Sequence, residues 1–424
     1  MLGWTNWIIE HRKRVIGLWI VIAVLGVMGA AALGDLLTNR FSVPGSEAEQ
    51  GRDLLGEHFQ ERGDGDFVLV AEATGGTDRS QQFQTAVSDA AKRAAGEVDG
   101  ARAGIVQDAS STLAYVQITT PLENDDAADH TVPMRDAIGT VPGAQTYLSG
   151  APAVNHDTEK IYNDDLSKGE SIAVPIALLV LIFMFGTLVG TLVPLLFAAV
   201  TIPTTLGIVW IFAPGFAMAV YVSNIVTLIG LAIAIDYSML IVFRFREQLD
   251  AGEEPHEALR TTMATAGRAT LFSGGTVAVG LALLVLMPLP FIRSLGVGGL
   301  FVPLVSIVAS ATLLPALLAT MGTGINRLRV VPRRVLERRA AADATGAWHR
   351  LATSIMRRPV VWFLASGGLM VACALPAFGL HLTGGDNRGV PLTTESTRGL
   401  HVLETTLGPG VLAPHQVVVD SHRR

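Results

Sequence analysis

The sequence contains little cysteine and little charge. Its 424 residues include a single cysteine, Cys373, which excludes an intrachain disulfide and a multi-cysteine metal or redox site. Only 16% of the residues are charged, whereas 50% are hydrophobic. This balance is too apolar for an ordinary soluble protein, so the composition indicates a membrane protein.

Short motifs that carry catalysis or cofactor binding are missing as well. The ten histidines show no metal-binding spacing such as HExxH, and no nucleophile motif of the GxSxG type occurs. A phosphate-binding loop of the form GxxxxGK(S/T) is also absent, so nucleotide-driven transport by this chain has no support. We therefore expect no enzymatic activity, no cofactor, no bound metal and no nucleic-acid partner.

Long apolar runs, by contrast, are frequent. A run of about 20 apolar residues is long enough to cross the hydrocarbon core of a bilayer as a helix. The first run could instead belong to a secretory signal, but its length and the six later runs favour a membrane span. The predicted spans are residues 15–34, 171–190, 192–213, 221–243, 269–288, 295–321 and 359–380.

Acidic and basic residues are segregated along the chain. Residues 35–170 contain 24 Asp or Glu and 10 Lys or Arg, whereas residues 322–358 contain 9 Lys or Arg and 2 Asp or Glu. Basic loops stay on the cytoplasmic side of a membrane, so we expect the cluster at 11–14 and the segment 327–358 to be cytoplasmic. The acidic block and the tail from His381 then lie outside the cytoplasmic (inner) membrane.

The acidic block is long enough for a small domain. Apolar residues at helical spacing indicate an amphipathic helix over 79–99. Strands are predicted at 66–73, on both sides of "DASS" (108–111) and at 144–150, with a weaker helix at 124–139. The order β-α-β-β-α-β is that of the split βαβ, or ferredoxin-like, arrangement. We thus predict an α-helical polytopic membrane protein of about seven spans with an external α+β ferredoxin-like domain.

The tail of the chain repeats the start of this external domain. Glu47 matches Glu395, Gly51 matches Gly399 and Leu55 matches Leu403, and a basic cluster and a span precede each copy. The repeating unit is one span, an external domain and five spans, and the second copy stops inside its external domain. We expect one half of a two-repeat protein that ends in a truncation. Its predicted segments are 1–34, 35–170, 171–321, 322–358, 359–380 and 381–424.

Asp236 is the only acidic or basic residue inside the predicted spans. A charge at the centre of a membrane helix costs about 3 kcal/mol, so its presence calls for a role. The leading hypothesis is a proton-carrying group. The alternatives are a structural hydrogen bond across helices and a position in a deep water funnel without a role.

Other polar residues accompany Asp236. Tyr237 is adjacent to it, and Ser273, Thr276 and Gly280 share one face of the following span. That face suits close helix packing, contact with a proton path, or both. The basic pair in "RFRE" (244–247) is interpreted as a solvated anchor at the cytoplasmic surface, with a conformational latch as the alternative.

Three stretches resemble the mycobacterial membrane protein large (MMPL) family of the resistance–nodulation–division superfamily. They are "FSVPGSEAEQGRDLL", "GLAIAIDYSMLIVFRFREQL" and "EALRTTMATAGRATLFSG". In that family the aspartate and tyrosine of the fourth span relay protons, which by match implies Asp236 and Tyr237. Ser273 matches a polar position near the relay. The resemblance implies proton-driven export of lipids or other hydrophobic molecules through external porter domains, here 35–170.

Family members have about twelve spans and a second Asp-Tyr pair in their second half. The resemblance therefore leaves three expectations for this chain. It is a lipid exporter driven by the proton-motive force; it is an inactive fragment or a non-transporting scaffold that docks envelope enzymes; or it is a half-transporter that needs a second chain or a second copy of itself.

Overall fold

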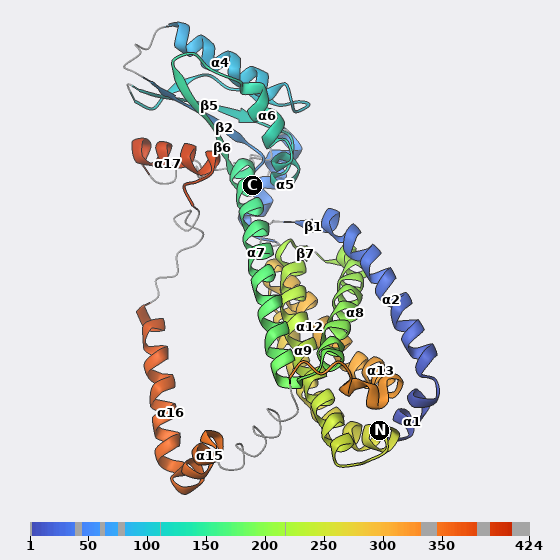
Figure 1. The fold of residues 1–424 in the computed structure, drawn as a ribbon. Helices are drawn as coiled ribbons and strands as arrows, with labels where there is room; N and C mark the ends of the chain where they lie inside the picture. Colours follow the sequence, from blue (N-terminus) through green and yellow to red (C-terminus); the bar gives the residue numbers. More distant parts are fainter. Residues whose placement is uncertain are drawn as a thin grey trace. The chain divides into compact units, whose positions relative to one another are not determined.

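The computed structural model describes residues 2–38, 45–59, 64–74, 81–110, 112–216, 218–331, 346–379 and 391–408 (Figure 1). The chain divides into two compact units. The membrane unit comprises Met1–Arg40 and Ala173–Gly385, and the sheet unit comprises Phe41–Ile172 and Asp386–Arg424.

Seven helices in the described ranges are long and apolar enough to cross a membrane, so the chain is a multi-pass helical membrane protein, as predicted. Hydrocarbon offers no hydrogen-bond partners, and a helix satisfies its own backbone groups. The spans are carried by α2 (Arg12–Leu33), α7 (Ala151–Phe185), α8 (Leu188–Phe212), α9 (Tyr221–Asp250), α11 (Arg268–Val285), α12 (Pro290–Ala311) and α16 (Pro359–Ala374). Shorter helices of the membrane unit are α1 (Leu2–Glu10), α10 (Pro255–Thr262), α13 (Leu313–Met321) and α15 (Ala347–Arg357), and β1 (Leu37–Thr38) pairs with β7 (Met218–Ala219).

The boundary between the second and third spans differs from the prediction. The second span was expected over 171–190, whereas α7 starts at Ala151 and ends at Phe185. Gly186 follows with a φ of 66°, a conformation that glycine adopts without strain and that ends helices. Thr187 then accepts a hydrogen bond from the Gly190 N–H at 3.3 Å and starts α8. The connection between the two spans therefore lies at Gly186 and Thr187, whereas the predicted spans left it at residue 191.

The sixth span is not one continuous helix. Residues 295–321 were predicted as a single span, but the helix breaks at Thr312 between α12 and α13. Pro315 explains the break, because its nitrogen has no hydrogen to donate to the carbonyl of Ala311 four residues earlier. The Trp4 indole N–H donates to that carbonyl instead, at 3.1 Å. The Trp19 indole N–H donates to Thr312 Oγ1 at 3.0 Å, so the break holds α1 and α2 in place.

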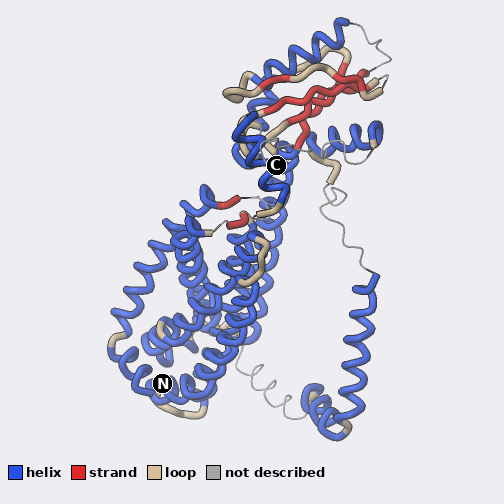
Figure 2. Tube along the Cα trace, turned by 180° about the vertical axis from the view of Figure 1, so that it is seen from behind, coloured by secondary structure: helices blue, strands red, loops and turns tan. Residues whose placement is uncertain are grey.

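The sheet unit contains an antiparallel sheet in the order β3-β5-β2-β6, with β4 also paired to β5 (Figures 1 and 2). Its strands are β2 (Phe67–Ala73), β3 (Arg102–Ala103), β4 (Gln107–Asp108), β5 (Leu113–Thr119) and β6 (Ala144–Gly150). Its helices are α3 (Glu47–Phe59), α4 (Gln81–Ala95), α5 (Asn124–Ala128), α6 (Thr131–Ile138) and α17 (Glu395–Leu407).

Alternation along the strands gives the sheet two buried faces. Phe67 and Leu69 pack in the cluster that α4 and α6 complete, whereas Val68 and Val70 pack in a cluster with Leu403 of α17. Successive strand residues point to opposite faces, so α17 covers the face that α4 and α6 leave free. The α17 helix and its repeat counterpart α3 both have 13 residues and begin at the matched glutamates. The repeat strand expected at 417–419 lies outside the described residues.

Two spans approach each other through glycine. A Cβ atom on Gly207 of α8 would lie 2.7 Å from the Cα of Gly26 on α2, and a Cβ on Gly26 would collide with the Pro203 carbonyl. Gly17, on the same helix, has open space around its Cα. The α2–α8 contact therefore depends on the absence of a side chain at Gly26.

We predict that Gly26→Ala destabilises the protein by about 1–3 kcal/mol, because the added methyl group overpacks the α2–α8 contact. Gly17→Ala is the matched control and should change the stability by less than about 1 kcal/mol. Thermal unfolding of the purified protein in detergent measures both. Equal melting temperatures for the two variants would contradict the close approach.

Candidate functional site

The first candidate site lies on α9. Asp236 belongs to a stripe of exposed residues on this helix, spaced by three or four positions along one face. The stripe comprises Leu228, Ala232, Asp236, Leu240, Phe243 and Glu247. The carboxylate thus points away from the other helices of the described membrane unit, and its nearest neighbours along the stripe are apolar.

Tyr237 points the other way, into the helix bundle. Its side chain is 8% exposed, and a Cβ on Gly274 of α11 would lie 3.3 Å from its ring. Its hydroxyl is buried without a hydrogen-bond partner among the described residues. A buried, unpaired hydroxyl costs about 1–3 kcal/mol, so this group is held at an energetic cost.

Ser238 differs from its neighbour, because its hydroxyl is satisfied. Its Oγ donates to the carbonyl of Ala234 at 2.5 Å and to that of Ile235 at 3.1 Å. These bonds stay within α9. Ser238 therefore has a structural role, and the free hydroxyl beside Asp236 is that of Tyr237.

Ser273 lies on an exposed face of α11. The buried residues of α11 are Thr270, Gly274 and Ala278, so the expectation that the face of Ser273, Thr276 and Gly280 packs closely is wrong for the described part of the chain. Tyr237 packs against Gly274, the residue after Ser273. The structure therefore brings Tyr237 to α11, and leaves Asp236 and Ser273 on exposed faces of their helices.

The interpretation of "RFRE" as a solvated anchor also needs correction. Arg246 is partly buried: its Nε donates to Asn326 Oδ1 at 2.8 Å and its Nη1 to the Phe185 carbonyl at 2.5 Å. The guanidinium also lies 5.9 Å from the centre of the Phe185 ring. Through these hydrogen bonds Arg246 links α9 to the end of α7 and to the segment after α13. Arg244 pairs with Glu247 at 2.5 Å.

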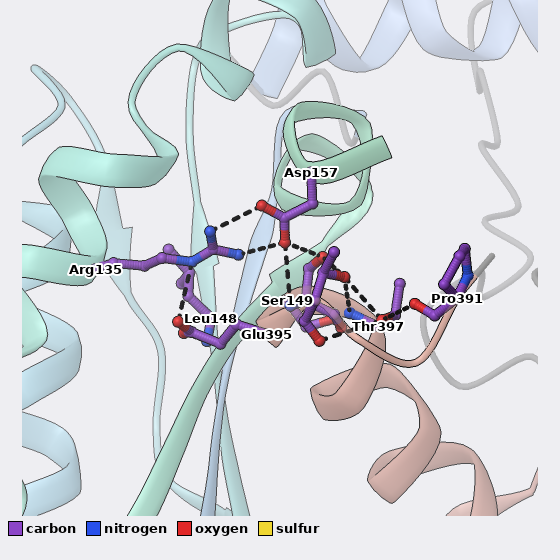
Figure 3. Close-up of polar contacts among 9 residues, drawn as sticks. Arg135, Leu148, Ser149, Asp157, Pro391, Glu395 and Thr397 are labelled. Carbon is purple, nitrogen blue, oxygen red and sulfur yellow. Dashed lines mark hydrogen bonds and ion pairs between the residues drawn. The ribbon is translucent and has the colours of Figure 1, made fainter. Parts of the chain in front are cut away.

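A second polar cluster, which the sequence did not predict, lies in the sheet unit (Figure 3). Arg135 of α6 donates to both carboxylate oxygens of Asp157, at 2.9 and 2.7 Å. Ser396, at the start of α17, donates through Oγ to the same carboxylate at 2.5 Å. Asp157 is 8% exposed and Ser396 is fully buried. A bidentate pair of this kind is among the strongest polar contacts in proteins.

Glu395 attaches α17 to the edge of the sheet. Its Oε1 accepts the backbone N–H of Leu148 at 2.8 Å, and its Oε2 lies 3.3 Å from Arg135 Nε. Ser149 donates to the Ser396 carbonyl at 2.8 Å. Because β6 is an edge strand, α17 satisfies a backbone group that the sheet leaves unpaired. The match between Glu47 and Glu395 was the one sequence signal that pointed to this cluster.

Charge and hydrogen bonds set the protonation of this cluster. Burial alone would raise the pKa of Asp157, but the hydrogen bonds from Arg135 and Ser396 outweigh it and hold that pKa below its ordinary value. Burial acts to lower the pKa of Arg135, yet the hydrogen bond to Asp157 and the charge of Glu395 raise it. Both side chains are therefore ionised at neutral pH. No group of three or more His, Cys, Asp or Glu in the described ranges is arranged to hold a metal ion.

The chain is similar to known transport proteins along most of its length. The model of the MMPL family matches residues 40–362. The mycolic acid-containing lipids exporter MmpL11 of Mycolicibacterium smegmatis is 30% identical over 97% of this chain and 44% of that protein. The heme uptake protein MmpL11 of Mycobacterium tuberculosis is 30% identical over 95% of this chain and 42% of that protein. The trehalose monomycolate exporter MmpL3 of M. smegmatis is 25% identical over 92% of this chain and 42% of that protein. The chain thus spans less than half the length of these relatives.

We predict that Asp157→Asn destabilises the packing of α17 by about 2 kcal/mol, because Arg135 loses its bidentate carboxylate partner and keeps only the contact with Glu395. Hydrogen exchange of the α17 amides, corrected for intrinsic rates, measures this. Asp89→Asn is the control, since Asp89 forms an exposed pair with Lys92 at 3.6 Å and exposed pairs contribute little.

The same cluster predicts a pH dependence for α17. A lowered carboxyl pKa adds stability that is present above the ordinary value and is lost as pH falls through the lowered one. Protection of α17 should therefore be constant near neutral pH and decrease below about pH 4. In Asp157→Asn this decrease should be smaller. An identical acid response in both proteins would contradict the assignment.

Proposed function

The chain belongs to the MMPL family, and on this premise we propose that it takes part in exporting lipids or other hydrophobic molecules across the cytoplasmic membrane, driven by the proton-motive force. Two relatives are named as exporters of mycolic acid-containing lipids and of trehalose monomycolate. A third is named for heme uptake, so the proposed cargo is the wider class of hydrophobic molecules.

The observation that carries the proposal is the position of Asp236. It is a lone carboxylate in a span, on a helix face that the described residues leave exposed. A carboxylate can bind and release a proton, and a membrane-buried ionisable group is by default functional because its charge is otherwise only a cost. We assign proton binding to Asp236. Tyr237 follows Asp236 in the sequence, and we assign its hydroxyl, which has no partner in the described ranges, as a donor or acceptor of the relay. Ser273 is assigned to the same relay.

The exposed stripe also supports a half-transporter. A charged side chain that faces lipid costs free energy, so another polypeptide segment or a water-filled path should cover this face. We propose that a second set of spans covers it, whether from the same polypeptide, from a separate chain or from a second copy. The sheet unit is proposed as the external, ferredoxin-like porter domain, with the basic cluster at 11–14 and the segment 327–358 on the cytoplasmic side.

We predict that Asp236→Asn abolishes proton-coupled export, because asparagine cannot carry the proton. The full-length protein is reconstituted into liposomes with a pH gradient, and a trapped pH dye and a fluorescent phospholipid report proton flux and transport. Asp250→Asn is the matched control: it makes the same change on α9, beyond the apolar part of the span. Undiminished proton-coupled export in Asp236→Asn would exclude the proposed relay.

Tyr237→Phe separates function from stability. The variant removes a buried hydroxyl that has no partner in the described ranges, so the melting temperature should stay the same or rise by the equivalent of about 1 kcal/mol. Proton-coupled export should nevertheless decrease. If export is unchanged while the protein is equally or more stable, Tyr237 is not part of the relay.

A further inference from the structure

A basic cavity lies at the end of the membrane unit where α2 begins and α9 ends. Its volume is about 680 Å³. Three segments form it: the end of α1, the first turn of α2 and the start of α10. The lining residues are Asn6, Ile9, Glu10, His11, Arg12, Lys13, Arg14, His256 and Arg260.

The charge of the cavity favours an anion. Four of the lining side chains are Lys or Arg and one, Glu10, is acidic. The contribution from α10 is fixed in position, because Arg260 Nε donates to Asn6 Oδ1 at 2.7 Å and the guanidinium also pairs with Glu257. These contacts fix the position of the Arg260 guanidinium beside the cavity, while Glu257 offsets part of its charge.

The helix that carries the other cations begins at the cavity. Arg12 is the first residue of α2, and His11 makes no side-chain bond to the first N–H groups of that helix. The His11 Nδ1 atom is instead paired with the Trp7 carbonyl at 3.0 Å. The first turn of α2 therefore brings Arg12, Lys13 and Arg14 to the cavity without a side-chain cap.

The surroundings of the cavity are those of a bilayer interface. Trp4 and Trp7 are 53% and 48% exposed, their rings stack 5.7 Å apart, and Trp7 stacks on the His11 ring at 4.8 Å. Exposed tryptophans at the end of a span lie at the level of lipid headgroups. The hydrogen bond from Trp4 to the Ala311 carbonyl holds α1, which lies beside α13 (Figure 1).

The internal repeat contains a second cavity of the same character. It has a volume of about 480 Å³ and lies on α15, directly before the span of the second copy. Its lining residues are His349, Arg350, Thr353, Ser354, Arg357 and Arg358. Two cavities that are basic at the same place in the repeat indicate a shared ligand chemistry.

We propose that the cavity formed by α1, α2 and α10 binds the phosphate headgroup of an anionic lipid in the adjacent leaflet. Basic pockets beside membrane spans are suited to such headgroups, and the tryptophans place the acyl chains in the bilayer while the headgroup meets Arg12, Lys13, Arg14 and Arg260. This lipid is a bound component of the membrane unit. Its binding does not depend on transport and is separate from the Asp236 relay.

The test measures lipid affinity of the full chain in detergent, after delipidation. Phosphatidylglycerol, phosphatidylcholine and inorganic phosphate are titrated separately, and the rise of the melting temperature reports binding. The variant is Lys13→Gln with Arg14→Gln; both side chains are exposed, and the melting temperature without lipid checks the fold. The control is Arg268→Gln with Arg329→Gln, two exposed cations of the membrane unit outside the cavity.

Each lost cation should weaken phosphatidylglycerol binding roughly fivefold, and the double variant therefore about 25-fold. The control should stay within about twofold of the unchanged protein, and phosphatidylcholine should bind weakly to all. Equal losses in variant and control would mean a diffuse surface charge and overturn the site. Saturation by millimolar inorganic phosphate in place of the lipid would assign the cavity to a free anion and overturn the lipid proposal. If the double variant unfolds, Lys13→Gln alone gives the same comparison with a fivefold expectation.

Discussion

The membrane unit depends on one constraint: every backbone polar group in hydrocarbon must find a partner within the protein. Seven helices satisfy that constraint along most of their length. Prolines within α7, α8 and α12 remove individual backbone donors, and at the break after α12 Pro315 cannot donate to the Ala311 carbonyl. The indole of Trp4 compensates for the missing bond. This bond, together with the bond from Arg260 to Asn6, joins α1 to the break before α13 and to α10, and the position of α1 in turn shapes the basic cavity.

The same rule separates satisfied from unsatisfied side chains on α9. Ser238 satisfies its hydroxyl within its own helix, so it needs no further explanation. Tyr237 has a buried hydroxyl without a partner in the described part of the chain, and Asp236 has a charge on an exposed face. Both cost free energy in the isolated unit. Side chains that are unsatisfied in this way are the ones for which a partner in the working protein is expected.

In the sheet unit, charged side chains position α17, just as the Trp4 hydrogen bond positions α1 in the membrane unit. The helix α17 comes from the second copy of the repeat, yet it completes the sheet of the first copy. Leu403 fills the apolar face, and Glu395 and Ser396 join the pair formed by Arg135 and Asp157. Apolar burial accounts for the affinity of this contact, while the directional bonds fix the register of α17 on β6. The repeat is therefore interleaved with the first copy along this sheet.

The sequence by itself determined the number and approximate place of the spans and the identity of Asp236, because a long apolar run and a lone charge within it are local properties. It also indicated α4 correctly from helical spacing. Only the tertiary structure decided where α7 ends and that the sixth span is broken. It also decided which face of α11 is buried, and it showed that Arg246 is hydrogen-bonded to neighbouring segments rather than solvated. It alone joined Asp157 to Ser396, 239 residues apart. Hydrogen-bond partners so far apart leave no periodic pattern in the chain, and they become neighbours only when distant segments pack together.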